Sequence, residues 1–314
     1  MDSFSVTLAS AYLLDLAIGD PRWLPHPVRG MGWAIDRGER WVRARLQDEK
    51  LAGGILVALI AGGTWLAAKG LLWAAGRISD WAVPLTEMAL LYVCLSTRDL
   101  AVESWPVYRA LKGNNLPEAR RKVSLIVGRD TENLNEKEVV RAAVETIGES
   151  AMDGIVAPLF YAAIGGAPLA CLYKAVNTLD SMVGYRSARY LRFGSVAAAV
   201  DRAMNWIPAR LTAFFLSMAA QILHRSGGRS LLAMRRDGLP TRENSFIAEA
   251  AIAGALGIQL GGTNYYQGKP TEAPPLGDPL RELRPERISE SIRLMYLCSI
   301  LAALCAVAVR IFLR

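Results

Sequence analysis

The sequence predicts an all-α, polytopic integral membrane protein with about four full membrane spans, a re-entrant helical hairpin and cytoplasmic amphipathic helices. Hydrophobic residues make up 52% of the 314 residues, and the mean hydropathy is positive, which is unusual for a soluble domain. Long apolar stretches alternate with loops rich in lysine and arginine, as in proteins that cross a membrane repeatedly. We therefore expect a single membrane-embedded domain over residues 1–314.

Four segments are expected to span the membrane, because each is apolar over most of the length that a bilayer requires, about 20 residues. They are Ser3–Ile18, Leu51–Ala68, Trp81–Thr97 and Leu294–Val309. No basic region precedes the first, so we expect a retained span and not a cleaved signal. The third contains Glu87, and an acid inside a membrane costs at least about 2.5–3.5 kcal/mol. That side chain should face protein, either as a structural hydrogen-bond partner or as a functional group.

Three large basic loops, residues 19–50, 98–153 and 225–293, are expected to face the cytoplasm, which places the N-terminus outside. The helices expected in them are Ile35–Lys50, Leu116–Val127, Asn135–Ile147 and Phe246–Gly262. The first should lie along the membrane surface, with Trp33 and Trp41 at the level of the headgroups. Thr263–Arg287 is rich in proline and is expected to form an irregular loop.

Residues 144–210 concentrate the chemistry around a charge-free apolar run, Gly154–Tyr173. The run contains Gly165-Gly166-Ala167-Pro168, and inside a helix glycine costs about 1 kcal/mol and proline about 3 kcal/mol. We therefore expect two half-helices that enter the membrane and return. Leu211–Leu223 is also apolar, but it is short and is expected not to span.

Polar residues flank the apolar run on both sides. Three acids spaced four residues apart precede it, and three polar residues spaced three apart follow it. They are Glu145, Glu149 and Asp153, and then Lys174, Asn177 and Asp180. A hairpin would bring both groups to the same side of the membrane, where one site could use them.

The acids of this stretch are candidates for magnesium binding and for catalysis. Mg²⁺ takes oxygen ligands and usually also binds substrate phosphates, so we assign Glu149, Asp153 and Asp180 as candidate ligands. Asp201 could converge with them. The structural alternative is that these acids are helix-terminal charges and members of surface ion pairs.

A cationic cluster follows the apolar run and consists of Lys174, Arg186, Arg189 and Arg192. Arginine binds phosphate in a bidentate manner and lysine acts as a point charge; the alternative is anchoring of a membrane segment. Asn177, Thr178 and Ser181 could order phosphate oxygens or could instead satisfy the backbone.

Three further polar positions have two interpretations each. His26, between two prolines, either presents an imidazole to a substrate or closes a turn. Asn244-Ser245 and Glu249 stand where a loop becomes a helix. They could bind substrate, or Ser245 could be only an N-cap with Glu249 supporting the first turn.

Several functional classes are excluded. The net charge is +7, but no nucleic-acid-binding motif is present, so we expect no nucleic-acid partner. The sequence has no phosphate-binding P-loop, dinucleotide-binding glycine motif, zinc motif or nucleophile elbow. The four cysteines lie in apolar runs without metal or redox spacing and should be small buried hydrophobic residues.

Four segments nevertheless resemble a known family, the CbiB/CobD adenosylcobinamide-phosphate synthases of cobalamin biosynthesis. They are Leu13–Gly32, Glu149–Tyr185, Phe193–Ala213 and Glu243–Gly262, and they follow in family order over nearly the whole chain. The chain departs from the family pattern at Asp201-Arg202 and at Arg242–Phe246. These departures leave Arg202 and the turn before Ser245 without an assigned role.

The resemblance implies an ATP-dependent amide synthase with Mg²⁺ and ATP as requirements. It would join the corrinoid adenosylcobyric acid to (R)-1-amino-2-propanol or its O-phosphate, at the cytoplasmic face of a bacterial or archaeal inner membrane. We assign catalysis to Asp153, Lys174, Asp180 and Asp201. Substrate binding is assigned to His26, Arg29, Asn177, Arg186, Asn205, Arg210, Asn244, Ser245 and Glu249.

Two alternatives are a corrinoid transporter and a non-catalytic membrane regulator of related fold. A broken helix with polar ends is also a transporter device. Membrane lipid is an expected partner in every case, and the chain could form a homo-oligomer.

Overall fold

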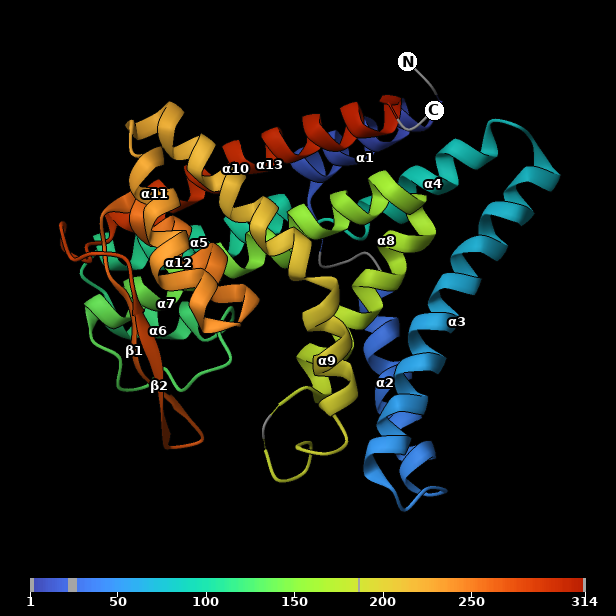
Figure 1. Ribbon diagram of the computed structural model, residues 1–314, viewed down its shortest axis with the longest axis horizontal. Coiled ribbons are helices and arrows are strands. Elements are labelled where there is room, and N and C mark those ends of the chain that lie inside the picture. The colour runs from blue at the N-terminus through green and yellow to red at the C-terminus, as the bar shows by residue number, and fades with distance from the viewer. Residues whose placement is uncertain (1–2, 22–26, 186, 313–314) are drawn as a thin grey trace. The chain divides into compact units, whose positions relative to one another are not determined.

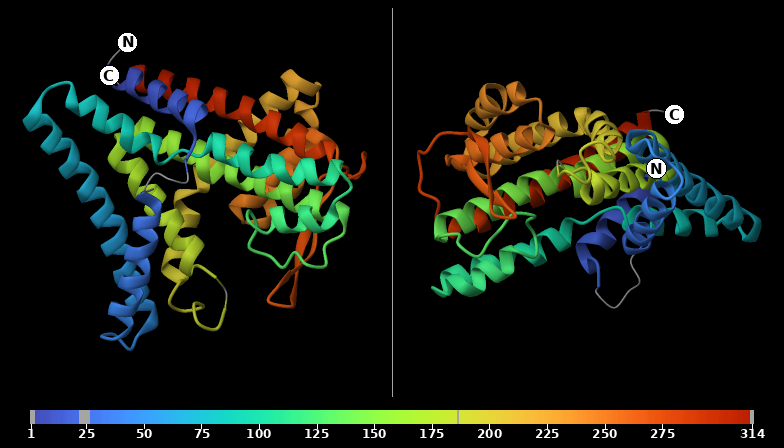
Figure 2. Two further views of the ribbon diagram at one scale, coloured as in Figure 1. Left: turned by 180° about the vertical axis from the view of Figure 1, so that it is seen from behind. Right: turned by 90° about the horizontal axis from the view of Figure 1, so that it is seen from below.

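The structure is a computed structural model that describes residues 3–21, 27–185 and 187–312 (Figure 1; two further views in Figure 2). The described chain is mainly helical. Its α-helices are α1 (Ser3–Ile18), α2 (Pro27–Arg43), α3 (Glu49–Ile78), α4 (Ala82–Tyr92), α5 (Thr97–Lys112), α6 (Leu116–Val123), α7 (Glu136–Ala151), α8 (Ala157–Val183), α9 (Ser195–Met204), α10 (Trp206–His224), α11 (Gly227–Ala233), α12 (Asn244–Leu256) and α13 (Glu286–Phe312). Two π-helical turns, η1 (Met152–Val156) and η2 (Met234–Gly238), and a 3₁₀ turn, η3 (Leu239–Thr241), complete the helical part.

Within the described residues, four helices are long and apolar enough to cross a membrane, which confirms the polytopic all-α class. They are α3, the continuous helix Glu136–Val183, α10 and α13. Two of the expected spans, Leu51–Ala68 and Leu294–Val309, lie inside α3 and α13. The expected span Trp81–Thr97 is wrong, because α4 has only 11 residues and is about 16 Å long.

Two further predictions about membrane spans are also changed by the observed lengths of the helices. The segment Ser3–Ile18 forms a helix with the expected bounds, but its 16 residues fall below the length of a full span. Leu211–Leu223, expected not to span, is part of the 19-residue helix α10, which is long enough. The described part of the chain therefore contains the expected number of candidate spans, but two of the four are not the segments that were expected.

The chain divides into two compact units. Unit 1 comprises Met1–Ser96, Ala157–Trp206 and Ala303–Arg314, and unit 2 comprises Thr97–Val156 and Ile207–Ala302. Each unit is described by itself below.

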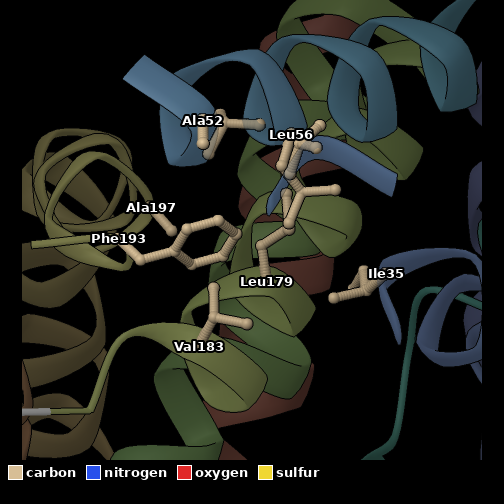
Figure 3. Packing of buried hydrophobic residues seen from close by; sticks show 9 residues of the cluster. Ile35, Ala52, Leu56, Leu179, Val183, Phe193 and Ala197 are labelled. Carbon is tan, nitrogen blue, oxygen red and sulfur yellow. The ribbon is translucent and has the colours of Figure 1, made fainter. Parts of the chain in front are cut away.

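Unit 1 is organised by close packing of α3 against α8, α2 and α9. Its buried core joins Ile35 of α2, Leu56 of α3, Leu179 of α8 and Phe193 of the connection before α9 (Figure 3). A Cβ on Gly53 would lie 1.8 Å from the carbonyl oxygen of Phe193. Glycine is therefore required where α3 meets that connection.

The expected interruption of the apolar run is confirmed inside α8. Gly166 has φ 69° and ψ −169°, a conformation that favours glycine, and the two arms of α8 meet there at an angle (Figure 1). Glu87 of α4 accepts a hydrogen bond from the backbone N–H of Ala167. The structural role of Glu87 is therefore confirmed: it satisfies a donor that the break leaves without a helical partner. Whether the bend returns the chain to the same side of a membrane stays a prediction.

Unit 2 packs α7 against α12, with a two-stranded hairpin beside them. Asn135 caps α7 in a reciprocal capping box with Glu138, as the expected start of this helix requires. The irregular loop expected at Thr263–Arg287 is wrong in its first half, because β1 (Leu260–Tyr266) pairs antiparallel with β2 (Lys269–Leu276). The prolines of β2 are tolerated since a two-stranded sheet has only edge strands.

The turn of this hairpin explains why the strands form. Gln267 and Gly268 both have positive φ, 53° and 75°, as in a two-residue turn that matches the twist of an antiparallel pair. The carboxylate of Asp130 accepts hydrogen bonds from both of their backbone N–H groups, at 3.1 and 2.7 Å. The segment before α7 thus holds the turn.

The cysteines mostly follow expectation. Cys94, Cys171 and Cys298 are buried, whereas Cys305 is exposed. The prediction for Cys305 is wrong because it lies on the outward face of the long helix α13.

Candidate functional site

In unit 2, the carboxylates lie where α7 meets α12. Glu145 and Glu149 are one helical turn apart on α7, with Glu145 buried and Glu149 exposed. A Cβ on Gly148 would lie 3.4 Å from the Cα of Glu249 on α12. The glycine therefore lets the two helices approach closely enough to place Glu249 beside the acids of α7.

Glu145 is held in a buried polar network. Its Oε2 is 2.5 Å from Nη2 of Arg129, and the two side chains are 6% and 10% exposed. Its Oε1 accepts a hydrogen bond of 2.9 Å from the backbone N–H of Gly261. Arg129 also donates to Asn264 at 2.6 Å. The network joins α7 to β1 and to the segment that precedes α7.

A second arginine fixes the same strand. Arg141 donates to the carbonyl of Gly261, to that of Thr263 at 2.9 Å and to Asn264 Oδ1 at 3.0 Å. The planar guanidinium suits several acceptors at once. Both arginines therefore hold β1 against α7 and orient Glu145.

Glu249 is 6% exposed. Burial raises its pKa well above the usual value, and the neighbouring charges of Glu145 and Glu149 raise the pKa further. Arg129 and a hydrogen bond from Ser245 oppose the rise. Burial, followed by smaller effects of the same acids, also raises the pKa of Tyr266, which places its phenol beside this cluster. The raised pKa of Glu249 favours its protonated form, which suits a carboxyl that donates a hydrogen bond or transfers a proton.

The start of α12 corrects one alternative. Glu243 occupies the N-cap position, without a side-chain capping bond, so the interpretation of Ser245 as the N-cap is wrong. Ser245 instead hydrogen-bonds to Glu249 one turn later. Asn244 is the first residue of α12 and is half-buried.

Asp153 lies in the π-helical turn η1, which follows α7 directly. Such turns widen a helix locally and often occur at functional sites. Asp153 is half-buried. Arg210, also assigned to substrate binding, is half-buried on α10.

In unit 1, the second arm of α8 carries Lys174, Asn177 and Asp180, which are all half-buried. The hydroxyl of Thr178 donates to the carbonyl of Lys174 at 2.7 Å, and that of Ser181 to the carbonyl of Asn177 at 2.9 Å. The alternative in which these hydroxyls satisfy the backbone is therefore confirmed.

The end of α8 is built closely around Asp180. A Cβ on Gly184 would lie 1.9 Å from Asp180 Oδ1. The carboxylate is packed over this glycine, and any larger residue there would displace it.

A hydrogen-bonded chain links α8 to the end of α9. The hydroxyl of Tyr173 donates to Asn205 Oδ1 at 2.9 Å, and the amide of Asn205 donates to Asp201 Oδ2 at 3.0 Å. Asn205 is 1% exposed. Two residues assigned separately, Asp201 and Asn205, therefore act as one oriented pair.

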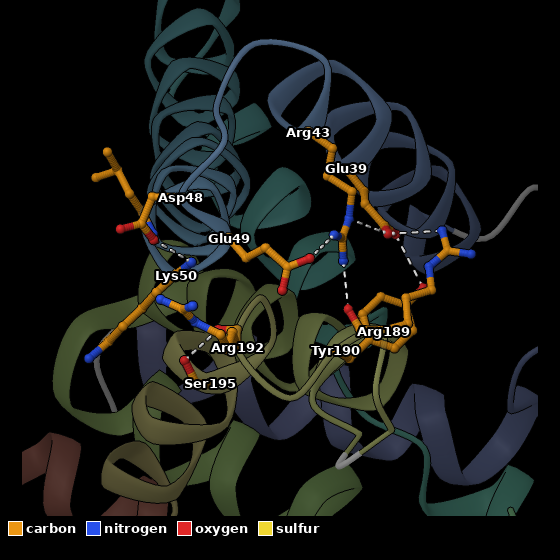
Figure 4. Close-up of polar contacts among 10 residues, drawn as sticks. Glu39, Arg43, Asp48, Glu49, Lys50, Arg189, Tyr190, Arg192 and Ser195 are labelled. Atoms are coloured by element: carbon orange, nitrogen blue, oxygen red, sulfur yellow. Dashed lines mark hydrogen bonds and ion pairs between the residues drawn. The ribbon is translucent and has the colours of Figure 1, made fainter.

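The cationic cluster is divided by the structure. Arg189 pairs with the buried Glu39 at 3.0 Å, and Arg43 of α2 contacts the same carboxylate at 3.0 Å (Figure 4). Arg189 is therefore engaged in an ion pair within unit 1, and both interpretations of the cluster, phosphate binding and membrane anchoring, stay predictions. Arg29 is exposed on α2. His26 and Arg186 lie outside the described residues.

Among the residues that the structure describes, no group of three or more histidine, cysteine, aspartate or glutamate side chains is placed to hold a metal ion. Glu149 and Asp153 belong to unit 2, whereas Asp180 belongs to unit 1. Their joint ligation of Mg²⁺ stays a prediction.

Comparison with known proteins decides the family. The chain matches the family described as "CobD/Cbib protein" over residues 8–295. This chain belongs to the CobD/CbiB family. No solved structure matches it significantly.

Curated relatives match over almost their full length. The "Cobalamin biosynthesis protein CobD" of Geobacter metallireducens is 48% identical over 94% of this chain and 93% of its own length. The "Cobalamin biosynthesis protein CbiB" of Salmonella typhimurium is 44% identical over 96% of this chain and 95% of its own. This CobD/CbiB chain therefore has the length and order of segments of its relatives.

Three residues of the carboxylate cluster were missing from the sequence-based candidates: Arg129, Arg141 and Asn264. Glu145 was singled out by its spacing of four residues from Glu149 but was given no role of its own. Arg141 lies on α7 itself, four residues before Glu145, whereas Arg129 lies in the segment before α7 and Asn264 lies on a hairpin that was expected to be a loop.

Proposed function

We propose that this chain is an amide synthase of cobalamin biosynthesis. It would couple ATP hydrolysis to joining adenosylcobyric acid and (R)-1-amino-2-propanol, or its O-phosphate, to give adenosylcobinamide or its phosphate. The observation that carries the proposal is family membership over residues 8–295, together with relatives of nearly equal length named for cobalamin biosynthesis.

The chemistry requires activation of a carboxylate, which is a poor electrophile. A propionate oxygen of the corrinoid would attack the γ-phosphorus of ATP, and the bond to the ADP oxygen would break. The amine nitrogen would then attack the acyl phosphate carbon. Inorganic phosphate would leave and the amine would lose a proton to a base. Phosphoryl transfer depends mainly on positioning and charge neutralisation, which this chain's polar residues would supply.

Each group of residues has a role in this proposal. Lys174 and Arg186 would neutralise phosphate oxygens, and Asp180 or Asp201 would take the proton of the attacking amine. The hydrogen bond from Asn205 to Asp201 at 3.0 Å supports the second choice, because it orients the carboxylate.

The carboxylates of unit 2, Glu145, Glu149 and Glu249, would position the substrate and take part in a second proton transfer. Burial and the neighbouring acids raise the pKa of Glu249, and in its protonated form it would donate a hydrogen bond to a carboxylate or phosphate. Asn244 and Ser245 begin the same helix and would contact the same substrate.

Mg²⁺ fits the donor chemistry of this region. Glu149 and Asp153 offer carboxylate oxygens one turn apart, Asp180 is the third candidate, and Mg²⁺ is often held by one or two carboxylates plus substrate phosphates. When bound, the ion would neutralise charge on the transferred phosphoryl group.

The location follows from the loops. We propose a bacterial or archaeal inner-membrane protein whose basic loops and active site face the cytoplasm, where ATP is present.

The experiment is direct. Purified protein in detergent is incubated with adenosylcobyric acid, ATP, Mg²⁺ and each amine, and the products are identified by mass. Asp153→Asn and Lys174→Ala should abolish product while the protein still inserts. Asp80→Asn and Lys69→Ala, at exposed positions outside the candidate site, are the matched controls. Full activity in either site variant would contradict its role. Uptake of corrinoid into proteoliposomes without ligation would instead favour a transporter.

A further inference from the structure

Unit 1 contains a cavity that the proposed reaction does not use. It is open to the outside, has a volume of about 550 Å³ and lies between α9, the start of α3 and α8. Most of its wall is apolar and comes from one side of α9, with Val196, Val200 and Met204 among the lining residues. Lys50 and Ser195 supply polar atoms, and Tyr161 contributes from α8.

Lys50 lines this cavity, and a second cation, Arg192, lies beside Lys50. At the corner where α3 begins, Asp48 caps the helix by accepting from the backbone N–H groups of Lys50 and Leu51, and Glu49 pairs with Arg43 at 2.8 Å. The side chains of Lys50 and Arg192 have no hydrogen-bond or ion-pair partner among the described residues. Figure 4 shows Arg192 beside Lys50 and Ser195, and both cations lie near enough to Asp48 to lower its pKa, after the larger effect of its backbone hydrogen bonds.

The neighbouring helix α2 carries the residue types that are common at a membrane surface. On α2, which packs against α3 and α8, Trp33 and Trp41 are 62% and 49% exposed. Arg37 lies 5.3 Å from the ring centre of Trp33, and Arg45 lies 4.4 Å from that of Trp41. Exposed tryptophan with arginine on an amphipathic helix is typical of the boundary between headgroups and acyl chains. Only residues 44–48 separate the end of α2 from Glu49, where α3 begins.

We propose that this cavity binds one anionic phospholipid, with its phosphate at Lys50 and Arg192 and an acyl chain along α9. The charges match an anion, and the apolar wall of α9 matches a hydrocarbon chain, which a free phosphate would leave unused. At headgroup level, lipid phosphate is also the most concentrated anion. The proposal is independent of the amide synthase activity.

The test measures binding to the full-length protein in a neutral detergent by native mass spectrometry. The probes are dioctanoyl-phosphatidylglycerol, dioctanoyl-phosphatidylcholine and inorganic phosphate. We expect the anionic lipid to bind most tightly. Lys50→Gln and Arg192→Gln should each weaken it about fivefold, and the double variant about 30-fold. Val200→Trp, which fills the cavity and keeps both charges, should also weaken binding.

Lys69→Gln is the matched control, because Lys69 is another exposed lysine of α3, 19 residues further along the helix. It should leave the affinity unchanged. Equal binding of the two lipids, or an affinity in the Lys50→Gln/Arg192→Gln variant equal to that of the wild type, would overturn the proposal. Inorganic phosphate binding as tightly as the anionic lipid would also overturn it and would indicate a site for a soluble anion.

Discussion

Replacing Arg129 by glutamine should destabilise unit 2 strongly, because it leaves the charge of Glu145 buried without its partner. The two side chains are 10% and 6% exposed, with Nη2 2.5 Å from Oε2. Two charges with centres about 4 Å apart attract by about 4 kcal/mol at an effective dielectric constant of 20. Breaking a buried pair from one side typically costs about 3–5 kcal/mol.

The hydrogen bond that Glu145 keeps places the expected loss at the lower end of the range of about 3–5 kcal/mol. Glu145 keeps its 2.9 Å hydrogen bond from Gly261, so we expect a loss of about 3 kcal/mol in the free energy of unfolding for Arg129→Gln. Glu145→Gln in the same chain removes the orphaned charge. The double variant should therefore lose about 1–3 kcal/mol less than the sum of the single variants.

The assay is a denaturant titration in detergent micelles, followed by helical circular dichroism. The control is Arg121→Gln, which breaks an ion pair between Arg121 and Glu118 of similar geometry, 2.6 Å, with Arg121 65% exposed. The control should leave the midpoint unchanged, because solvent screens exposed pairs. Equal midpoints for Arg129→Gln and Arg121→Gln would refute the structural role given to the buried pair.

Three further outcomes are expected. Gly166→Ala should lower the free energy of unfolding by about 1–2 kcal/mol, because φ is 69° there and a left-handed backbone disfavours a Cβ. Gly62→Ala is the control, because an added Cβ at Gly62 would meet open space, and thermal melts should show no loss of stability for it. The pKa of Glu249 is higher in the folded protein than in the unfolded chain. Its contribution to the free energy of unfolding is therefore fully present below about pH 4.5 and is lost as the pH rises through the pKa of the folded state. Glu249→Gln should flatten that dependence in melts from pH 4 to 9, and an unchanged slope would exclude Glu249 as its source. Phe193→Ala should cost about 3–5 kcal/mol, because the ring is fully buried, and a loss below 1 kcal/mol in denaturant titrations would contradict the core described for unit 1.

Local sequence signals predicted part of the fold well. The Gly165–Pro168 interruption, the cap at Asn135 and the apolar cores of α3 and α13 depend on residues adjacent in the chain. Which segments are long enough to span the membrane was less predictable, because that length depends on where each helix begins and ends. Helix α4 ends at Tyr92, whereas α10 begins at Trp206. The hairpin was missed because the proline-rich composition of Thr263–Arg287 indicated an irregular loop, whereas the edge strand β2 tolerates its prolines.

The candidate site was predictable only where its residues share a helix. Glu145, Glu149 and Asp153 follow from spacing, and Thr178 and Ser181 had a stated structural alternative that holds. Arg129 could not be found, because its contact with Glu145 depends on how the segment before α7 folds back. Tertiary contacts of this kind leave no periodic pattern in a single sequence.

Amide formation by way of an acyl phosphate can be tested by following an oxygen isotope. Adenosylcobyric acid with ¹⁸O in the reacting carboxylate is incubated with the protein, ATP, Mg²⁺ and the amine, and the products are analysed by mass spectrometry. If the acyl phosphate forms, one ¹⁸O atom is expected in the inorganic phosphate for each amide formed, with ADP as the other product. Label appearing in AMP, or amide formed without consumption of ATP, would contradict it.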